Sequence, residues 1–267
     1  MLAGVVVLLL FRRINPNNRT HRAIVSDDIV ILRQIGRGPH VPSLTPFAVK
    51  LESYLRFAGV KYQSIHGKDK GPKGKWPWIE YKGQATADSE FCIARIDKAQ
   101  GIDLNSHLSS EQKGVGRAVQ RMVEENTYWT LVLDRWVYDK TEEIYNVLRI
   151  PWFVRWRVRS SIKNMAYSHG IGRHSKEEVY EILRTDLQAL SNVLGVKRFL
   201  MGSRPCQHDC AVFGMLAEIM WEPFGGFTHA ILCEFPNLVR YCENMKEDVW
   251  PDWDECTTKR KSASPQS

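Results

Sequence analysis

Residues 28–65 alternate between runs that favour strands and one run that favours a helix. Ile29 to Ile35 is a β-rich, mostly apolar run, which is typical of a central strand buried on both faces. From Thr45 the apolar residues return at helical spacing, and Gly59 ends the predicted helix. A second strand-like run follows at once. The order strand, helix, strand predicts a βαβ unit whose two strands lie parallel.

The next segment predicts a β-hairpin followed by a helix. Residues 66–75, HGKDKGPKGK, carry four Lys, three Gly and a Pro, which excludes an ordinary helix. The runs WPWIEY and QATA flank Lys82-Gly83 and therefore predict a hairpin. Asp88 or Ser89 then caps a helix. Residues 28–100 are expected to form a βαββα domain with a mixed four-stranded sheet.

Residues 107–252 are expected to form a second, all-α domain. SSEQ at 109–112 and the pair Ser175 and Glu178 are capping boxes, and each opens an amphipathic helix. The first of these helices is expected to reach about Tyr138. Two further apolar helices follow, over Ala211–Trp221 and from Pro236 onward. The pattern therefore divides the chain into a mixed domain and a helical domain.

One helical run is basic and aromatic. In Arg149–Lys163, Trp152, Phe153 and Trp156 share one helical face, and the other positions carry Arg155, Arg157, Arg159 and Lys163. We expect the aromatic face to pack in the core of the helical domain. The alternative is an exposed face that binds an anionic membrane surface or a partner.

The two ends of the chain differ from the rest. Met1–Phe11 is apolar and is followed by Arg12 and Arg13, but at about 1.5 Å per residue it covers only about half of a ~30 Å hydrocarbon core. It also lacks the cleavage site of a secretory signal. Residues 1–26 are therefore interpreted as the end of a membrane anchor, a mitochondrial address or a dispensable leader. The basic, Ser-rich tail, residues 256–267, is expected to be disordered.

Composition and charge narrow the functional classes. The chain is 43% hydrophobic and 25% charged, as in ordinary globular proteins. Its net charge of +7 comes without a zinc-finger, RNP or Lys/Arg-tract signature, so no nucleic-acid partner is expected. The six Cys form no CxxC pair, which favours a reduced compartment. Cys206, His208 and Cys210 lack a second ligand pair, so we expect buried or capping roles and no metal site.

Four stretches carry a resemblance to a known family. They are SLTPFAVKLESYLRFAGVKY, KWPWIEYKGQATADSEFCIARI, FLMGSRPCQHDCAVFGML and EFPNLVRYCENMKED. In order, they resemble the first helix and second strand, the cis-proline hairpin with its Ser-opened helix, and two core-helix stretches of glutathione transferases. Within that superfamily the chain is most similar to the failed axon connections family, which is related to the metaxins. The resemblance implies a thioredoxin-like N-terminal domain packed on an all-α domain.

The resemblance and the chemistry both indicate Pro77, Trp78, Asp88 and Ser89 as substrate-binding residues. A proline before a strand adopts the cis form at modest cost, and the bend offers backbone groups to an extended peptide. Ser89 at a helix start offers a hydroxyl, an N–H and the positive helix end to a carboxylate. In glutathione transferases the corresponding Ser holds the γ-glutamyl carboxylate. Simple N-capping by Asp88-Ser89 and a fold-defining turn at Pro77 are the structural alternatives.

The group that would activate a thiol is harder to find. Enzymes of this family need a Tyr, Ser or Cys at the start of the first helix, and only Ser43 and Thr45 are candidates here. A helix cap is the simpler role for both. Thr45 and Ala48 occupy the places of the two Cys of redox relatives, which excludes dithiol chemistry. The family's helix between the second and third strands, which contacts the glycine end of glutathione, is also missing.

These observations lead to three functional hypotheses. The first is a non-catalytic or weakly catalytic interaction protein of the failed axon connections type; the resemblance implies a role in axon development and neuronal signalling. The second is a glutathione-dependent transferase that uses Ser43 or Thr45, and the third is a metaxin-like component of mitochondrial outer-membrane import.

Expected location and partners follow from the same features. We expect a cytoplasmic protein, membrane-associated through its apolar N-terminal segment, with the mitochondrial outer membrane as the alternative. No cofactor is expected, and glutathione is the one candidate ligand. A membrane surface bound through Met1–Phe11 and Arg149–Lys163 and a homodimer, which is usual in the superfamily, are the candidate partners.

Overall fold

The computed structural model describes residues 28–222 and 224–259. The predictions for the leader, including Met1–Phe11, and for tail residues 260–267 lie outside these described residues. Disorder is wrong for residues 256–259, because the Thr258 and Lys259 N–H groups donate to the Gly38 and Pro39 carbonyls at 2.9 and 3.1 Å. The N-terminal part contains a four-stranded mixed sheet, as predicted. Its strands are β1 (Val30–Gln34), β2 (Tyr62–His66), β3 (Trp78–Tyr81) and β4 (Gln84–Ala87), in the order β2-β1-β3-β4. β1 pairs parallel with β2 and antiparallel with β3, and the β3–β4 hairpin turns at Lys82-Gly83.

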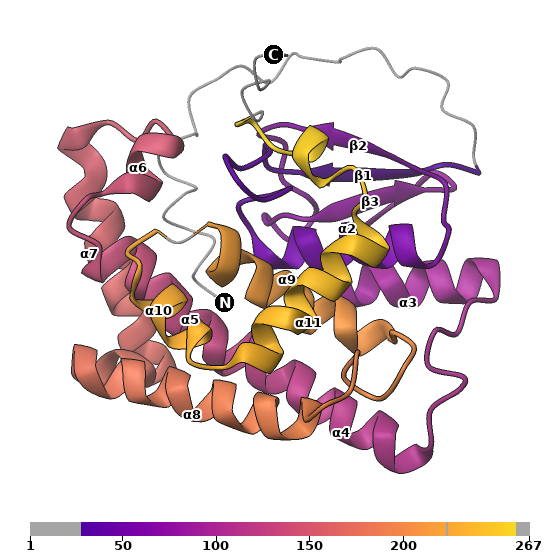
Figure 1. Cartoon of the computed structure of the whole chain (residues 1–267). Coiled ribbons are helices and arrows are strands. Elements are labelled where there is room, and N and C mark those ends of the chain that lie inside the picture. The colour runs from indigo at the N-terminus through magenta and orange to yellow at the C-terminus, as the bar shows by residue number, and fades with distance from the viewer. Residues whose placement is uncertain (1–27, 223, 260–267) are drawn as a thin grey trace, which may run out of the picture.

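Two helices cover one face of this sheet (Figure 1). They are α2 (Pro46–Phe57) and α3 (Ser89–Gln100). Val30 and Leu32 of β1 point to this side because side chains alternate along a strand, and they join a core with apolar residues of both helices. The segment between β2 and β3 contains turns and no helix, as predicted. It covers the other face, where Gly71 packs on the Trp78 ring so closely that a Cβ would lie 2.6 Å from it.

The C-terminal part is helical throughout. The predicted helix from Ser109 to Tyr138 is confirmed as four consecutive segments, two of them π-helical: α4 (Ser110–Arg121), η1 (Met122–Thr127), α5 (Tyr128–Leu133) and η2 (Asp134–Tyr138). The others are α6 (Glu143–Val147), α7 (Trp152–His169), η3 (Ile171–Arg173), α8 (Lys176–Leu194), α9 (Gln207–Trp221), α10 (Phe227–Cys233), α11 (Pro236–Val249) and η4 (Trp253–Cys256). Both predicted capping boxes form. Within the described ranges, no helix combines the length and apolar content that a bilayer crossing demands.

The two parts share one core. α9 crosses α2 at Gly214, where a Cβ would lie 2.6 Å from the Pro46 carbonyl oxygen and 2.8 Å from the backbone nitrogen of Lys50. The backbones therefore touch, because glycine has no side chain to separate them. Val41 and Val49 from the sheet domain belong to the same buried cluster as the apolar residues of α8, α9 and α11.

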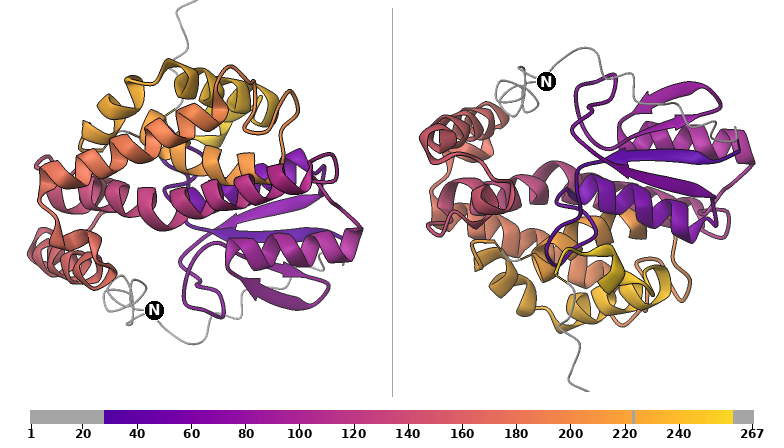
Figure 2. Two further views of the ribbon diagram at one scale, coloured as in Figure 1. Left: turned by 90° about the horizontal axis from the view of Figure 1, so that it is seen from below. Right: turned by 90° about the horizontal axis from the view of Figure 1, so that it is seen from above.

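The prediction for the aromatic face of residues 149–163 is wrong. Trp152, Phe153 and Trp156 of α7 are 80%, 59% and 63% exposed. The face that α7 buries consists of the smaller aliphatic residues Val154, Val158, Ile162 and Ala166. α6 and α7 lie together at the end of the molecule away from the sheet (Figures 1 and 2).

Candidate functional site

The strand register brings the predicted site residues to one edge of the sheet. Trp78 pairs with Arg33 near the carboxyl end of β1, and Ala87 pairs with Trp78. Pro77 and Asp88 therefore leave the sheet at this same edge. Since α2 returns antiparallel to β1, its N-terminus also lies here. The edge carries the proline loop, the start of α3 and the start of α2.

The proline loop has the predicted geometry. The Trp76–Pro77 peptide bond is cis. Among the described residues, nothing hydrogen-bonds the backbone N–H or carbonyl of Trp76, so both groups are available to an extended peptide. The Trp76 and Trp78 indoles both donate to the Asp69 carbonyl, at 2.9 and 3.1 Å. The structure thus buries the Trp78 ring beneath the 67–75 loop and leaves the backbone N–H and carbonyl of Trp76 without a partner among the described residues.

The start of α3 separates the roles of Asp88 and Ser89. Asp88 is the N-cap residue, and its carboxylate accepts a hydrogen bond from the Glu90 N–H at 3.0 Å. Its φ of 82° lies in a region that favours glycine, and such strain clusters at functional sites. Ser89 is the first helical residue and is only 5% exposed, and no group in the described part of the chain hydrogen-bonds its hydroxyl. Capping accounts for Asp88 only, and the Ser89 hydroxyl remains available at the positive helix end.

A buried ionic network fixes this helix start from behind. The Lys50 ammonium on α2 lies 2.7 Å from the Glu90 carboxylate and 2.6 Å from that of Glu124 on η1. Glu90 also accepts from Arg117 and Gln120, both at 2.7 Å. Burial by itself would raise the pKa of Glu90, but the nearby Lys50 ammonium outweighs it and the pKa is lowered. Glu90 is thus ionised, and its carboxylate is bound by Lys50, Arg117 and Gln120. Ser89 is therefore the residue at this helix start whose side chain is left to bind a ligand.

The start of α2, where a group that activates the glutathione thiol would lie, differs from what the sequence predicts. Thr45 occupies the N-cap position of α2, but its side chain makes no capping hydrogen bond. The Thr45 carbonyl accepts the Ala48 N–H at 3.0 Å in addition to the Val49 N–H at 3.2 Å, so one of the two N–H groups that an N-cap side chain would bind is already used. Ser43 is fully buried, and its hydroxyl has no partner within the residues described. Capping is therefore wrong for both residues, and only the half-buried Thr45 has an accessible hydroxyl.

The cationic loop contributes charge beside this edge. Lys70 lies over the Trp76 ring at 5.1 Å, and Lys73 over the Phe91 ring of α3 at 4.4 Å. These are cation–π distances, and Phe91 lies within the first turn of α3. The loop therefore places two ammonium groups around the free Trp76 backbone and the start of α3, where an anionic ligand would meet them.

The Cys-His-Cys segment is structural. The Cys206 N–H donates to the buried Asp209 carboxylate at 2.8 Å, and His208 hydrogen-bonds the side chain of Gln120 at 2.9 Å. Cys210 lies in the core beneath the sheet. Buried and capping roles are thus confirmed for this segment. Over residues 28–222 and 224–259, no three potential ligands gather as they would around a metal ion.

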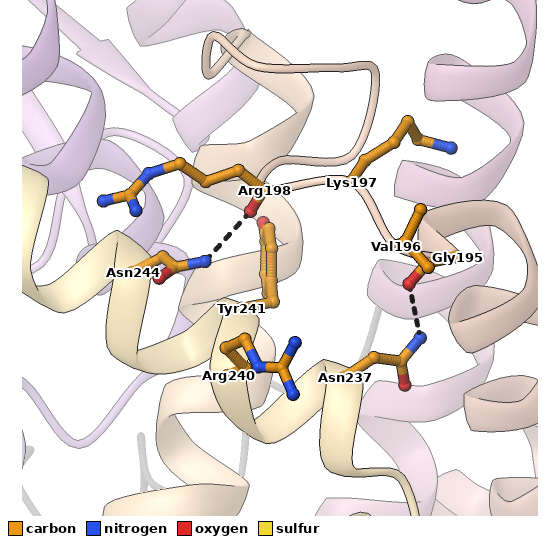
Figure 3. Close-up of a pocket in the computed structure, with 8 residues that line it drawn as sticks. All are labelled: Gly195, Val196, Lys197, Arg198, Asn237, Arg240, Tyr241 and Asn244. Carbon is orange, nitrogen blue, oxygen red and sulfur yellow. Dashed lines mark hydrogen bonds between the residues drawn. The ribbon is translucent and has the colours of Figure 1, made fainter.

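A surface hollow elsewhere has no connection with this edge. It is lined by residues of the α8–α9 link and of α11: Gly195, Val196, Lys197, Arg198, Asn237, Arg240, Tyr241 and Asn244 (Figure 3). Two of its amides are already used, since Asn237 donates to the Gly195 carbonyl at 3.1 Å and Asn244 to that of Arg198 at 3.3 Å. The charged residues that line the hollow are Lys197, Arg198 and Arg240, so its surface is basic.

Comparison with known proteins agrees with this architecture. Residues 46–141 match the family model of the glutathione S-transferase N-terminal domain, and residues 183–245 match that of the C-terminal domain. The isoprene-epoxide–glutathione S-transferase of a Rhodococcus species is 30% identical over 78% of this chain and 93% of its own length. A solved glutathione transferase family member from Pseudomonas fluorescens, with two glutathione bound, has a TM-score of 0.57 at 15% identity and covers 83% of this chain and 90% of its own. The chain belongs to the glutathione S-transferase family.

Within that family the chain is a glutathione-transferase-like protein of the failed axon connections type. It is 31% identical to failed axon connections of Drosophila melanogaster over 90% of this chain. The alignment covers 62% of that relative, so this chain spans about three fifths of its length. Metaxin-2 of Mus musculus is a more distant relative, 24% identical over 68% of this chain and 72% of its own.

Proposed function

We propose that this protein is a non-catalytic or weakly catalytic interaction protein that has kept the peptide-holding half of a glutathione site. The supporting observation is the contrast between the two sides of the sheet edge. The Ser89 hydroxyl is unpaired at a helix N-terminus, next to the free backbone of Trp76. Across from them, Ser43 is buried and no cysteine or tyrosine begins α2. The site suits a carboxylate-bearing extended peptide better than the activation of its thiol.

The biological role follows from the family type. We place the protein in axon development and neuronal signalling, acting through protein contacts at a cytoplasmic, membrane-associated location. The similarity to failed axon connections supports this role. The apolar leader is the expected anchor, and carbonate extraction of full-length protein and of protein lacking residues 1–26 tests it. Release of the full-length protein by carbonate would exclude anchoring by the leader.

The ligand part of the proposal is tested by calorimetry. Glutathione is titrated into wild type and Ser89→Ala, with Ser43→Ala as the matched control. A hydrogen bond to a charged group contributes about 1.5–3 kcal/mol, so Ser89→Ala should weaken binding at least about tenfold. Ser43→Ala should bind as wild type does, because its hydroxyl is buried away from the edge. Absence of saturable binding at millimolar glutathione would contradict the ligand assignment.

A second candidate function is glutathione-dependent transfer with Thr45 as the thiolate hydrogen-bond donor. Two observations favour it: the Thr45 hydroxyl is not used in capping, and one relative with 30% identity is named a glutathione S-transferase. Conjugation of glutathione to a chloronitrobenzene electrophile separates the two functions. Turnover that Thr45→Val abolishes, while Ser43→Ala retains it, would establish the transferase and contradict the non-catalytic proposal.

A third candidate function is a part in mitochondrial outer-membrane import. The similarity to metaxin-2 supports it, and so does the Arg-bearing leader outside the described residues. Fractionation of cells that express the full chain tests this alternative. Co-purification with mitochondria, resistant to salt, would favour it over a cytoplasmic site.

A further inference from the structure

The outer face of α7 is an unpartnered aromatic surface. Eight large hydrophobic side chains are exposed in the described residues, and four of them lie on this one helix: Trp152, Phe153, Trp156 and Tyr167. With 3.6 residues per turn, Trp152, Trp156, Ser160, Lys163 and Tyr167 line one side of the helix. Val154, Val158 and Ile162 lie on the opposite side, in the core. Exposed apolar patches of this kind mark interaction sites.

The charge on α7 has a single sign. The helix carries Arg155, Arg157, Arg159 and Lys163 and no acidic residue. Arg155 and Arg159 turn inward and pair with the Glu142 carboxylate, at 2.7 and 2.9 Å. Arg157 and Lys163 form no ion pair with any described residue, and the Arg157 guanidinium lies 5.6 Å from the Trp156 ring centre. Lys163 within the stripe and Arg157 beside it are therefore two positive charges without an ion-pair partner among the described residues.

The position of this surface fits a flat partner. The α6–α7 pair lies at one end of the molecule, away from the sheet (Figure 2). It falls in residues 142–182, between the two segments that match the family models. From Trp152 to Tyr167 the stripe is straight and about 22 Å long at 1.5 Å per residue. A stripe on the outer side of a helix at the end of the molecule suits contact with a flat surface.

We infer that the outer face of α7 binds an anionic lipid bilayer, with the Trp and Phe rings at the headgroup level and Arg157 and Lys163 on lipid phosphates and carboxylates. Trp and Tyr favour the membrane–water interface because their rings are amphipathic. Basic side chains contribute about fivefold each, or ~1 kcal/mol, to binding at an anionic leaflet. This inference is independent of the proposed glutathione site, because it concerns a different face and a different ligand, and it adds a second contact to the membrane-associated location proposed above.

Vesicle sedimentation of the full chain tests the inference. Vesicles of phosphatidylcholine alone are compared with vesicles of equal parts phosphatidylcholine and phosphatidylserine. The protein should bind the anionic vesicles, and added salt should weaken this binding. Arg157→Gln/Lys163→Gln should lower the affinity on the order of 20-fold. The matched control, Lys197→Gln/Arg240→Gln at the basic hollow of Figure 3, should leave it unchanged.

A dye attached to α7 reports on contact between this helix and the membrane, separately from any binding through the leader. Ser160→Cys lies within the stripe, and Ala189→Cys lies on the exposed side of α8; both are made in a Cys233→Ser background, because Cys233 is the one exposed cysteine of the described residues. An environment-sensitive dye at position 160 should shift to the blue with anionic vesicles, and one at 189 should not. Trp152→Ser/Trp156→Ser should abolish the shift at 160.

Three results would overturn the inference. They are an unshifted dye at position 160 on vesicles that carry the protein, equal shifts at 160 and 189, and equal affinity for neutral and anionic vesicles. Sedimentation velocity addresses the competing occupant, a second copy of the chain. A dimer that Trp152→Ser/Trp156→Ser dissociates would assign the face to self-association instead.

Discussion

Lys50 and Glu124 form an ion pair across the boundary between the sheet domain and the helical domain, with Nζ 2.6 Å from Oε1 and exposed fractions of only 2% and 4%. Burial disfavours the ammonium and lowers the pKa of Lys50, while the nearby carboxylate of Glu90 opposes this. The pair therefore depends on both partners. Losing one partner weakens the network without leaving the other charge alone, because Lys50 also pairs with Glu90 and Glu124 also pairs with Arg121.

The first prediction follows from this pair. Glu124→Ala should lower the free energy of unfolding by about 1.5–3 kcal/mol, because Lys50 loses one charge-assisted hydrogen bond but keeps its pair with Glu90. Glu234→Ala removes a partner of Arg184 on the surface, where both side chains are about half exposed, and should cost less than about 1 kcal/mol. Urea unfolding of both variants measures the difference. Equal losses in the two variants would contradict the buried-pair interpretation.

The second prediction compares two fully buried serines of the sheet domain. The Ser43 hydroxyl has no partner, whereas the Ser53 hydroxyl accepts a hydrogen bond from the Trp250 indole N–H at 2.8 Å. Ser43→Ala should leave stability unchanged or raise it by up to about 1 kcal/mol, because an unpaired buried hydroxyl is costly. Ser53→Ala should lower it by about 1–3 kcal/mol, because the indole N–H loses its acceptor. Thermal unfolding distinguishes the two, and a larger loss for Ser43→Ala would reverse the assignment.

The third prediction concerns Asp209. Its carboxylate is fully buried and accepts the Leu200 and Cys206 N–H groups, each at 2.8 Å. Asp209→Ala should destabilise the protein by about 3–5 kcal/mol, since charge-assisted hydrogen bonds contribute about 1.5–3 kcal/mol each. Asp248→Ala, which removes a surface partner of Arg198, is the matched control. Denaturant midpoints give the comparison, and a loss below about 1 kcal/mol for Asp209→Ala would show that the link before α9 is held by other contacts.

The fourth prediction is a pH dependence at Glu222. Burial raises the pKa of this carboxyl from 4.5 to about 7, although it accepts the His40 N–H at 2.9 Å and Arg135 lies close. The folded state therefore holds a proton that the unfolded state releases above about pH 4.5, so this group lowers stability as the pH rises from there to about 7. Glu222→Gln removes this loss.

The effect of Glu222 is measured as the difference in unfolding free energy between Glu222→Gln and wild type. Stability of Glu222→Gln relative to wild type should rise between about pH 5 and about pH 7, by at most about 1.4 kcal/mol per pH unit. The difference cancels titrating groups that do not interact with Glu222, such as His208, whose pKa burial lowers. Glu218 also contributes, because the Glu222 charge helps to raise its pKa. Glu181→Gln provides the matched surface change on α8. A difference that falls with rising pH would show that Glu222 is ionised in the fold.

The sequence predicts most of the fold because local signals agree with the final packing. The hairpin at Lys82-Gly83, the capping boxes and the helix to Tyr138 all rest on residues close in the chain. The differences lie in element bounds: the second strand, predicted at 60–65, is Tyr62–His66, and the helix predicted over Ala211–Trp221 begins at Gln207. These predictions hold because local propensity and tertiary contacts favour the same structure in these segments.

The wrong predictions concern segments whose sequence is compatible with two different local arrangements. In α7 both the aromatic stripe and the aliphatic stripe have helical spacing, and the spacing alone does not say which one faces the core. At Thr45 the backbone carbonyl accepts the Ala48 N–H, which is one of the two N–H groups that a capping side chain would accept. The network of Lys50, Glu90 and Glu124 joins residues far apart in the chain, and no short pattern encodes it.

The backbone contact at Gly214 also bears on experiments in cells. Because α9 and α2 touch through their main chains and share one apolar core, neither half of the protein retains its packing without the other. A truncation that removes the sheet domain or the helical domain should therefore produce an unfolded chain that is degraded. Phenotypes of such deletions would report loss of the whole protein, and point substitutions such as Ser89→Ala or Arg157→Gln are needed to separate its surfaces.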